Sequence, residues 1–405
     1  MTRRELRRIV VVGASAAGLV AAETLRREGF GGSVTVVGDE LHDPYDRPPL
    51  SKQILSGAWP SERSQLRSPD DLGALDVQFR LGVAATALNL ESHTVALADG
   101  HTLGYDGLII ATGVRPRRLQ AADGVSGVHV MRSLDDALAL RERLGADHRL
   151  VVVGAGFLGT EVAATSRALG ARVTLVEPAP VPLAPVLGDQ VGAVLGEMHR
   201  ERGVDVRVAT SVTEVLSDDG RATGVRLSDG TEVPADDVLV AIGSNPNTEW
   251  LEGSGLTLAD GVVCDEYSAA ATGVYAAGDV ARWHNPLFGT EMRIEHRTNA
   301  AEQGVAAARN LLHPDAPRPF APIPYFWSDQ YDVKVQAYGY LRGHEEVALV
   351  DGDFAEGRFL VAYRRGDRLV GVLSVGMPPK LIHGWRKAIG SASLWHTALG
   401  NPLTV

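Results

Sequence analysis

The sequence predicts an α/β protein in which two halves of similar architecture precede a small α+β domain. A short apolar strand followed by closely spaced glycines occurs twice, at 9–18 and again at 150–159. Each half also closes on a matching strand, at 107–113 and at 237–243. Because the features recur in the same order, we interpret them as an internal duplication.

The elements between these landmarks are matched as well. In the first half we expect a helix over 17–27, a strand over 34–37 and a hairpin with an Asp-Gly turn at 95–100. In the second half the corresponding segments are 157–169, 173–176 and 225–230. Strands that alternate with helices predict a parallel sheet of the Rossmann type in each half.

The rest of the chain contains a strand that ends in Gly278-Asp279 and a proline-rich linker over 314–324. After the linker, strand patterns and a helix over 379–391 predict the small α+β domain.

Composition excludes several classes of function. The chain has 405 residues and a net charge of −11, which argues against nucleic-acid binding because that needs a basic surface. No stretch approaches the about 20 apolar residues that span a bilayer. Cys264 is the only cysteine, so no intrachain disulfide can form and the cytoplasm is the expected compartment. We expect Cys264 to be a small buried residue, and the histidines show no metal-ligand spacing.

The glycines of each copy are typical of a dinucleotide-binding turn, where a pyrophosphate approaches backbone N–H groups at the start of a helix. The second copy is complete, with Gly154, Gly156 and Gly159, and Glu177 ends the next strand. A carboxylate there can accept hydrogen bonds from ribose hydroxyls and repels a 2′-phosphate. The second copy therefore favours NADH over NADPH.

The first copy is less complete, because Ser15 replaces the middle glycine between Gly13 and Gly18. Asp39 and Glu40 end the next strand, where a ribose-binding carboxylate belongs. Two such sites suggest that electrons pass from one dinucleotide to another. Without a cysteine pair, the final acceptor is not a disulfide of this protein.

A rigid loop, Pro44-Tyr-Asp-Arg-Pro-Pro-Leu-Ser-Lys52, follows the acidic strand end. Its prolines fix an extended path, and Ser51 is a good N-cap for a helix. This motif resembles the NADH-dependent ferredoxin reductases of bacterial oxygenase systems, and it is also similar to apoptosis-inducing factor. The resemblance covers essentially the whole chain.

The resemblance implies a glutathione-reductase-like architecture. An FAD-binding domain is expected over 1–115 and 247–324, an NADH-binding domain over 116–246, and a C-terminal interface domain over 325–405.

The resemblance also assigns roles to individual residues. Lys52 would lie beside the flavin ring with Glu161 as its partner near flavin N5, so these two are the candidate catalytic residues. A lysine there can stabilise negative charge on reduced flavin. The expected FAD-binding residues are Gly13, Ser15, Ala17, Gly18, Asp39, Glu40, Arg47, Lys52, Ala85, Arg132, Asp279, His296, Arg297 and Trp327. The expected NADH-binding residues are Gly154, Gly156, Phe157, Leu158, Gly159, Glu177, Gly243 and Glu295.

One residue departs from the family pattern, since Arg297 stands where many relatives carry tryptophan. If only the backbone of Arg297 touches the flavin, FAD binding survives. The solvent-accessible edge of the flavin site would then differ from that of relatives with tryptophan.

The C-terminal segment suggests where a protein acceptor docks. It contains no Asp or Glu from Arg368 onward, which makes it locally basic on an acidic protein. Such a patch suits an acidic two-iron ferredoxin, although an ordinary solvated helix face has the same composition. The basic residues are Arg368, Lys380, Arg386 and Lys387, with Arg63, Arg67 and Arg297 as a possible extension.

We interpret the chain as an FAD-containing NADH:ferredoxin oxidoreductase. Its ferredoxin would serve a haem monooxygenase or a ring-hydroxylating dioxygenase. The alternatives are an NADH oxidase, a rubredoxin reductase, or a signalling flavoprotein like apoptosis-inducing factor. The sequence leaves the oligomeric state open.

Overall fold

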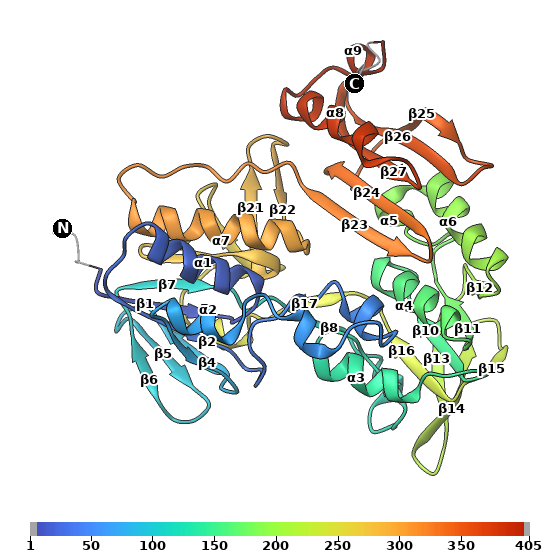
Figure 1. The fold of residues 1–405 in the computed structure, drawn as a ribbon, viewed down its shortest axis with the longest axis horizontal. Coiled ribbons are helices and arrows are strands. Elements are labelled where there is room, and N and C mark those ends of the chain that lie inside the picture. Colours follow the sequence, from blue (N-terminus) through green and yellow to red (C-terminus); the bar gives the residue numbers. More distant parts are fainter. Residues whose placement is uncertain (1–5, 401–405) are drawn as a thin grey trace. The chain divides into compact units, whose positions relative to one another are not determined.

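The computed structural model describes residues 6–400, and they divide into two compact units (Figure 1). Unit 1 comprises the chain up to Asp46, together with Ser64–Arg115 and Asn245–Pro324. Unit 2 comprises Arg47–Arg63, Pro116–Ser244 and the chain from Tyr325 onward. Segment 47–63 therefore belongs with unit 2, whereas the sequence analysis assigned it to the FAD-binding domain. The division into three domains stays a prediction.

Unit 1 is built around a six-stranded sheet with the order β19-β20-β7-β1-β2-β3. Its neighbours pair in parallel except β19 and β20. The strands are β1 (Arg8–Val12), β2 (Ser33–Val37), β3 (Gln78–Arg80), β7 (Gly107–Ile110), β19 (Ala269–Ala271) and β20 (Val274–Ala276). Because β1 has β2 on one side and β7 on the other, the carboxyl end of β1 is a topological switch point, where ligands bind in such sheets.

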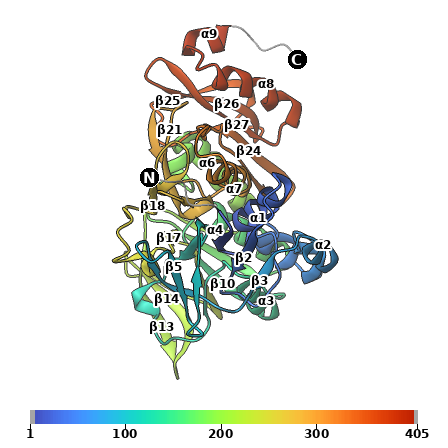
Figure 2. The same ribbon diagram turned by 90° about the vertical axis from the view of Figure 1, so that its left-hand side faces the viewer.

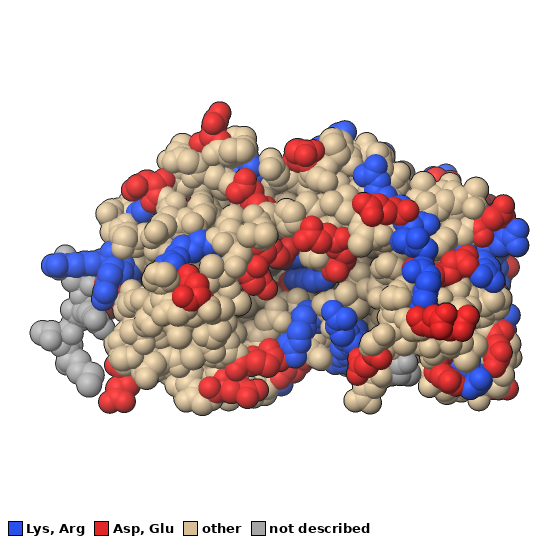
Figure 3. All heavy atoms as spheres, turned by 90° about the horizontal axis from the view of Figure 1, so that it is seen from below, with Lys and Arg blue, Asp and Glu red and all other residues tan. Residues whose placement is uncertain are grey.

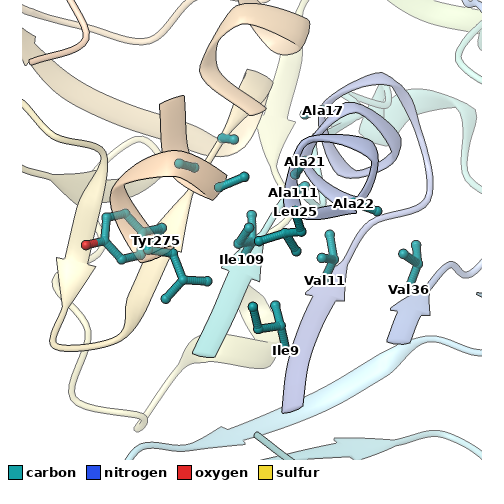
Figure 4. Close-up of a cluster of buried hydrophobic side chains, with 14 of the residues drawn as sticks. Ile9, Val11, Ala17, Ala21, Ala22, Leu25, Val36, Ile109, Ala111 and Tyr275 are labelled. Atoms are coloured by element: carbon teal, nitrogen blue, oxygen red, sulfur yellow. The ribbon is translucent and has the colours of Figure 1, made fainter. Parts of the chain in front are cut away.

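Helices α1 (Ala16–Arg27) and α7 (Arg297–Leu312) pack against each other and contribute side chains to one hydrophobic cluster with the central strands (Figures 1, 2 and 4). Ile9, Val11 and Ile109 face the two helices within that cluster. The helices approach closely because their contacts are small residues. A Cβ added at Gly304 would lie 2.5 Å from the carbonyl oxygen of Ala17. This packing fixes the N-terminal end of α1 at the switch point.

The remainder of unit 1 consists of short elements. These are α2 (Pro69–Ala74), the sheet β4 (Ala85–Asn89), β5 (Thr94–Leu97) and β6 (Thr102–Gly104), and the sheet β18 (Val262–Cys264), β21 (Ala281–Asn285) and β22 (Thr290–Met292). Cys264 is 6% exposed, and burial raises the pKa of its thiol to about 12. The expectation that Cys264 is a small buried residue is confirmed.

Unit 2 repeats the Rossmann pattern in a parallel sheet with the order β12-β11-β10-β16-β9. The strands are β9 (Val128–His129), β10 (Arg149–Val153), β11 (Arg172–Val176), β12 (Asp205–Arg207) and β16 (Asp237–Val240). Its helices are α3 (Leu134–Arg143), α4 (Phe157–Ala168), α5 (Ala184–Leu187) and α6 (Asp189–Glu201). The hairpin expected at 225–230 lies in a three-stranded sheet of β13 (Val212–Asp218), β14 (Arg221–Leu227) and β15 (Glu232–Pro234).

The C-terminal part of unit 2 is a five-stranded antiparallel sheet with the order β23-β24-β27-β26-β25. The strands are β23 (Tyr325–Gln330), β24 (Val333–Gly339), β25 (Glu346–Asp353), β26 (Arg358–Arg365) and β27 (Arg368–Val375), followed by α8 (Pro379–Gly390) and α9 (Trp395–Gly400). Apolar side chains of α5 and α6, such as Leu187 and Leu195, share a hydrophobic cluster with side chains of this sheet, such as Phe359. The sheet thus belongs to the same compact unit as the second Rossmann half.

Short strands β8 (Val114–Pro116) and β17 (Ser244–Pro246) lie where the chain passes from one unit to the other. The remaining short helices are η1 (Leu50–Ile54), η2 (Ser61–Ser64), η3 (Gln120–Ala122), η4 (Glu249–Leu251) and η5 (Gly278–Val280). None of the helices within residues 6–400 combines the length and apolar character needed to cross a membrane.

The start of β16 carries a buried acidic residue, Asp237, that is surrounded by basic side chains. The Asp237 carboxylate lies 2.9 Å from His129 Nε2, 3.0 Å from His148 Nε2 and 3.1 Å from Arg143 Nε. Burial opposes its ionisation, but the hydrogen bonds from His129 and Arg143 outweigh burial and hold its pKa below the ordinary value.

We expect Asp237→Asn to lower the free energy of unfolding by about 2 kcal/mol at neutral pH, measured by urea denaturation. A lowered native pKa stabilises the fold above the unfolded-state pKa of about 3.9, and this stability is lost as the pH falls through the native pKa. The difference between variant and parent should therefore shrink in acid. Asp205→Asn is the matched control, because Asp205 also begins a strand of this sheet but forms a largely exposed pair with Arg207. An equal loss in both variants would contradict the prediction.

Candidate functional site

The first fingerprint lies at the switch point of unit 1, between β1 and α1. Gly13 has φ +119°, and a Cβ there would lie 2.0 Å from the Ala111 carbonyl oxygen. A Cβ at Gly18 would lie 1.8 Å from the carbonyl oxygen of Gly13. Both positions thus require glycine for packing of the turn on the sheet. Ser15 is the N-cap of α1 with φ −99°, an ordinary value for serine, and its side chain makes no capping hydrogen bond to the described residues.

The other residues assigned to FAD in unit 1 flank this turn. Asp39 and Glu40 follow β2, with Asp39 exposed and Glu40 half-buried, where its carboxylate accepts a hydrogen bond from the Tyr45 hydroxyl. Asp279 lies in η5 directly after β20, and Ala85 begins β4. Because β1, β2 and β20 run parallel, Gly13, Asp39 and Asp279 share one edge of the sheet.

The segment Glu295-His296-Arg297 begins α7, with His296 as the N-cap. Glu295 is exposed and accepts a hydrogen bond from Arg293 Nη1 at 2.7 Å. The Arg297 guanidinium forms a hydrogen-bonded ion pair with Asp46, so its charge is already matched within unit 1. Arg297 is therefore a weaker extension of a basic patch than its sequence suggests.

The second fingerprint repeats the geometry of the first in unit 2. Gly154 has φ +102°, and a Cβ there would lie 2.4 Å from the Ala241 carbonyl oxygen. A Cβ at Gly159 would lie 1.9 Å from the Gly154 carbonyl oxygen, matching Gly18 in the first copy. Gly156, the N-cap of α4, is exposed, and a Cβ there would meet no described atom within 4 Å. The open backbone at a helix N-terminus fits a pyrophosphate.

Glu177 follows β11 and bends back towards this turn. One carboxylate oxygen accepts the Ala155 N–H at 2.7 Å, and the other accepts the Ala179 N–H at 2.9 Å. The side chain therefore also ties the fingerprint turn to the loop after β11. Each oxygen keeps a second lone pair that could accept a ribose hydroxyl.

The remaining residues assigned to NADH surround the fingerprint or end β16. Phe157 and Leu158 are half-buried in the first turn of α4, and the Phe157 ring packs on Phe326 with 4.8 Å between centroids. Gly243 follows β16 with φ +95°, and its carbonyl oxygen accepts the Arg117 N–H at 2.9 Å.

The pair proposed for catalysis is formed within unit 2. Lys52 Nζ lies 2.6 Å from Glu161 Oε2, and the two side chains are 11% and 9% exposed. Lys52 lies on η1, which packs against α4 where Glu161 occupies the second turn. The Thr165 hydroxyl of α4 donates to the Ser51 carbonyl oxygen at 2.8 Å and holds the two elements together. Because the pair is buried, removing either partner would leave an uncompensated charge in the interior.

Ser51 has a different role from the one predicted. It lies inside η1, whose N-cap is Pro49, and its hydroxyl donates to Glu161 Oε2 at 2.6 Å. The N-cap prediction was wrong because the partner of the hydroxyl is a carboxylate distant in sequence rather than the local backbone.

Two other residues assigned to FAD also meet in unit 2. Arg47 Nη1 donates to the Arg132 carbonyl oxygen at 2.5 Å, and the Arg132 N–H is held by Asp136 Oδ2 at 2.9 Å. Trp327 is half-buried on β23 and stacks on Tyr325 with 6.0 Å between centroids.

Glu161 is surrounded by polar residues that were not predicted from the sequence. The Ser328 hydroxyl donates to Glu161 Oε1 at 2.7 Å, and Gln330 Nε2 donates to Thr160 Oγ1 at 3.0 Å. A sequence signal existed, because alternation along β23 places Phe326, Ser328 and Gln330 on one buried face. Buried polar side chains generally have polar partners, so two of them on one strand face indicate a buried polar cluster.

The basic residues of the C-terminal segment lie on exposed positions of unit 2. In α8, Ile382, Trp385 and Ile389 are buried. The exposed basic residues are Arg368, Lys380, Arg386 and Lys387. Elsewhere, Arg67 pairs with Glu23 at 2.7 Å, and the Arg63 guanidinium lies over the Trp59 ring. Figure 3 shows one face of the molecule, on which lysine and arginine side chains are interspersed with acidic ones.

Known proteins match this chain over most of its length. Residues 7–304 match the family described as pyridine nucleotide-disulphide oxidoreductase, and residues 325–400 match the one described as reductase C-terminal. Putidaredoxin reductase of Pseudomonas putida is 39% identical over 377 residues, which cover 91% of this chain and 89% of that protein. The ferredoxin–NAD(+) reductase component of the p-cumate 2,3-dioxygenase system of Pseudomonas putida is 40% identical over 373 residues, covering 92% and 87%. The solved covalent putidaredoxin reductase–putidaredoxin complex matches with a TM-score of 0.91 and 37% identity, covering 95% of this chain and 93% of that one.

Proposed function

Because the chain belongs to the pyridine nucleotide-disulphide oxidoreductase family, we propose that it is an NADH:ferredoxin oxidoreductase. The chain would bind FAD and NADH, and electrons from NADH would reach a two-iron ferredoxin. That ferredoxin serves a haem monooxygenase or a ring-hydroxylating dioxygenase. The proposal is supported by relatives named as ferredoxin reductases and as components of dioxygenase systems.

The cysteine content decides between a protein disulfide and a one-electron carrier as the electron acceptor. The chain has a single cysteine, and Cys264 is buried with its thiol pKa raised to about 12. A relay through a redox-active disulfide of this chain would need two reactive cysteines. Electrons must therefore leave the flavin without a protein disulfide, as they would in transfer to a one-electron carrier.

We assign the two fingerprints to different dinucleotides. Gly13, Ser15 and Gly18 would hold the FAD pyrophosphate, and Gly154, Gly156 and Gly159 that of NADH. The FAD supplies hydride acceptance and single-electron release. Lys52 supplies a fixed positive charge for the flavin, and Glu161 holds the ammonium in place. The transfer needs close approach and control of charge rather than an acid or base.

We propose that the ferredoxin is acidic and docks through the basic residues of the C-terminal segment. Arg368, Lys380, Arg386 and Lys387 are exposed, and no acidic residue follows Arg368 in the sequence. Opposite charges would speed the encounter and make it sensitive to salt. The cytoplasm is the proposed compartment, because the chain can form no intrachain disulfide.

The decisive experiment is NADH-dependent cytochrome c reduction with and without added two-iron ferredoxins. We expect the rate to depend on one ferredoxin and to fall as salt is raised. Rapid oxygen consumption without any carrier would instead indicate an NADH oxidase, and reduction of rubredoxin alone would indicate a rubredoxin reductase. Very slow turnover with a long-lived charge-transfer complex would indicate a signalling flavoprotein.

The position of Glu177 predicts the coenzyme preference. We expect Glu177→Gln to reduce the ratio of kcat/KM for NADH to that for NADPH by about tenfold, because a carboxylate that repels a 2′-phosphate is lost. Steady-state kinetics with both coenzymes measure the ratio. Glu197→Gln, on the exposed side of α6, is the control and should leave the ratio unchanged. A ratio unaffected by Glu177→Gln would remove Glu177 from the ribose site.

A further inference from the structure

The buried Glu161 carboxylate accepts its hydrogen bonds from three protein side chains. Oε2 accepts hydrogen bonds from Lys52 Nζ and from the Ser51 hydroxyl, both at 2.6 Å. Oε1 accepts the Ser328 hydroxyl at 2.7 Å. A buried carboxylate needs such donors, because an unsatisfied buried charge costs several kcal/mol. Two of these donors come from η1, and the third comes from β23.

The hydrogen bonds continue from Ser328 into the interior of unit 2. Gln330 Nε2 donates to Ser328 Oγ at 3.2 Å, and Gln330 Oε1 lies 3.0 Å from His199 Nε2. His199 Nδ1 lies 3.0 Å from the Tyr331 hydroxyl. Ser328, Gln330 and His199 are all fully buried. The chain of contacts thus runs from Tyr331 to Glu161 without a break.

The chemistry of these groups fixes the direction of every hydrogen bond. Ser328 has one hydroxyl proton, which goes to Glu161, so its oxygen can only accept from Gln330. The Gln330 amide nitrogen therefore faces Ser328, and its oxygen faces His199. An amide oxygen only accepts, so the His199 proton must be on Nε2.

In neutral His199 the other ring nitrogen, Nδ1, is then left to accept the Tyr331 hydroxyl. Burial lowers the pKa of His199 to about 4, which keeps the ring neutral at physiological pH. Arg202 reinforces this, because its guanidinium lies 4.7 Å from the centre of the Tyr331 ring and opposes a second charge nearby.

We propose that Ser328, Gln330 and His199 are positioning residues for the Lys52–Glu161 pair. They form a one-directional hydrogen-bond chain in which every donor points towards the Glu161 carboxylate. Hydrogen bonds in such a chain polarise one another, so the carboxylate is held more firmly than by Ser328 alone. The inference extends the proposed function to residues that do not contact Lys52. It makes α6 and β23 part of the machinery that holds the lysine charge in place.

The first test does not depend on the flavin or on activity. In ¹⁵N-histidine NMR spectra of the unmodified protein, the His199 signal, assigned with a His199→Gln variant, should show a proton on Nε2 and a bare Nδ1. The pattern should persist to about pH 5, which is above the titration of this ring. A proton on Nδ1, or a doubly protonated ring at neutral pH, would overturn the proposal.

The second test compares two buried serines of the same sheet. Ser328→Ala removes the hydroxyl that donates to Glu161 Oε1. Ser374→Ala on β27 removes an equally buried hydroxyl that has no hydrogen-bond partner within residues 6–400. Because a hydrogen bond contributes about 1 kcal/mol, Ser328→Ala should slow flavin reduction by NADH by about threefold to tenfold and shift the flavin midpoint potential. Ser374→Ala should leave both unchanged.

A double-mutant cycle distinguishes the chain from independent contacts. Gln330→Met should give a smaller change in potential than Ser328→Ala, and the two substitutions should be non-additive, since either one breaks the same chain. Additive effects, or equal potentials in the Ser328→Ala and Ser374→Ala variants, would overturn the proposal. Failure of ferredoxin reduction with an intact Nε2–H signal and a shifted potential would contradict only the proposed function.

Discussion

Lys52→Met is expected to slow flavin reduction by NADH about a hundredfold, the usual effect of removing one preorganised electrostatic group. The ammonium is buried against Glu161, so no solvent cation can replace its charge. Anaerobic stopped-flow absorbance of the flavin measures the rate directly. The variant should also lose about 3 kcal/mol of unfolding free energy, because the Glu161 carboxylate stays buried without its counter-charge.

Two further variants separate the loss of rate from the loss of stability. In Lys52→Met/Glu161→Gln both charges are removed, so the unfolding free energy should largely recover while flavin reduction stays slow. Lys334→Met is the control, because that lysine is 48% exposed and lies 3.6 Å from Asp329 at the surface. An unchanged reduction rate in Lys52→Met would remove Lys52 from the site.

Gly159→Ala should disrupt the NADH-binding half of the chain. The added methyl would lie 1.9 Å from the Gly154 carbonyl oxygen, so α4 must move away from β10. We expect a loss of about 3 kcal/mol in unfolding free energy from overpacking and a rise of about a hundredfold in the KM for NADH. Chemical denaturation and steady-state kinetics measure the two effects.

Gly156→Ala probes the ligand separately from the fold. Its methyl meets no described atom within 4 Å, so the fold should lose only the about 1 kcal/mol of a poorer N-cap. If the NADH pyrophosphate lies there, the KM should still rise about tenfold with kcat unchanged. Gly145→Ala is the control, since its methyl also meets nothing and lies before β10. Equal KM values for the Gly156→Ala and Gly145→Ala variants would argue against a pyrophosphate at Gly156.

Much of the fold could be predicted because its signals are local. The glycine turns, the apolar strands and the first turns of α1 and α4 are encoded within about ten residues each, and the structure places α1 at 16–27 and α4 at 157–168. The family and the fold class are confirmed by the matches over 7–304 and 325–400. The cofactor-binding assignments stay predictions.

The surroundings of Glu161 could not be predicted in the same way. Ser51 and Ser328 reach this carboxylate from 110 and 167 residues away, and His199 reaches Gln330 from 131 residues away. No local pattern specifies such contacts. The N-cap prediction for Ser51 failed for the same reason, since tertiary structure gave its hydroxyl a charged partner.

The discontinuous course of unit 2 has a consequence for biosynthesis. The segment 47–63 carries Lys52 and leaves the ribosome early. Ser328, which also donates a hydrogen bond to Glu161, is translated much later. Domains generally fold as their chain emerges, but this unit is not complete until the sheet that starts at Tyr325 has been made. Lys52 and Glu161 are thus both translated well before Ser328, so we expect the complete set of donors around the Glu161 carboxylate to assemble only late in synthesis.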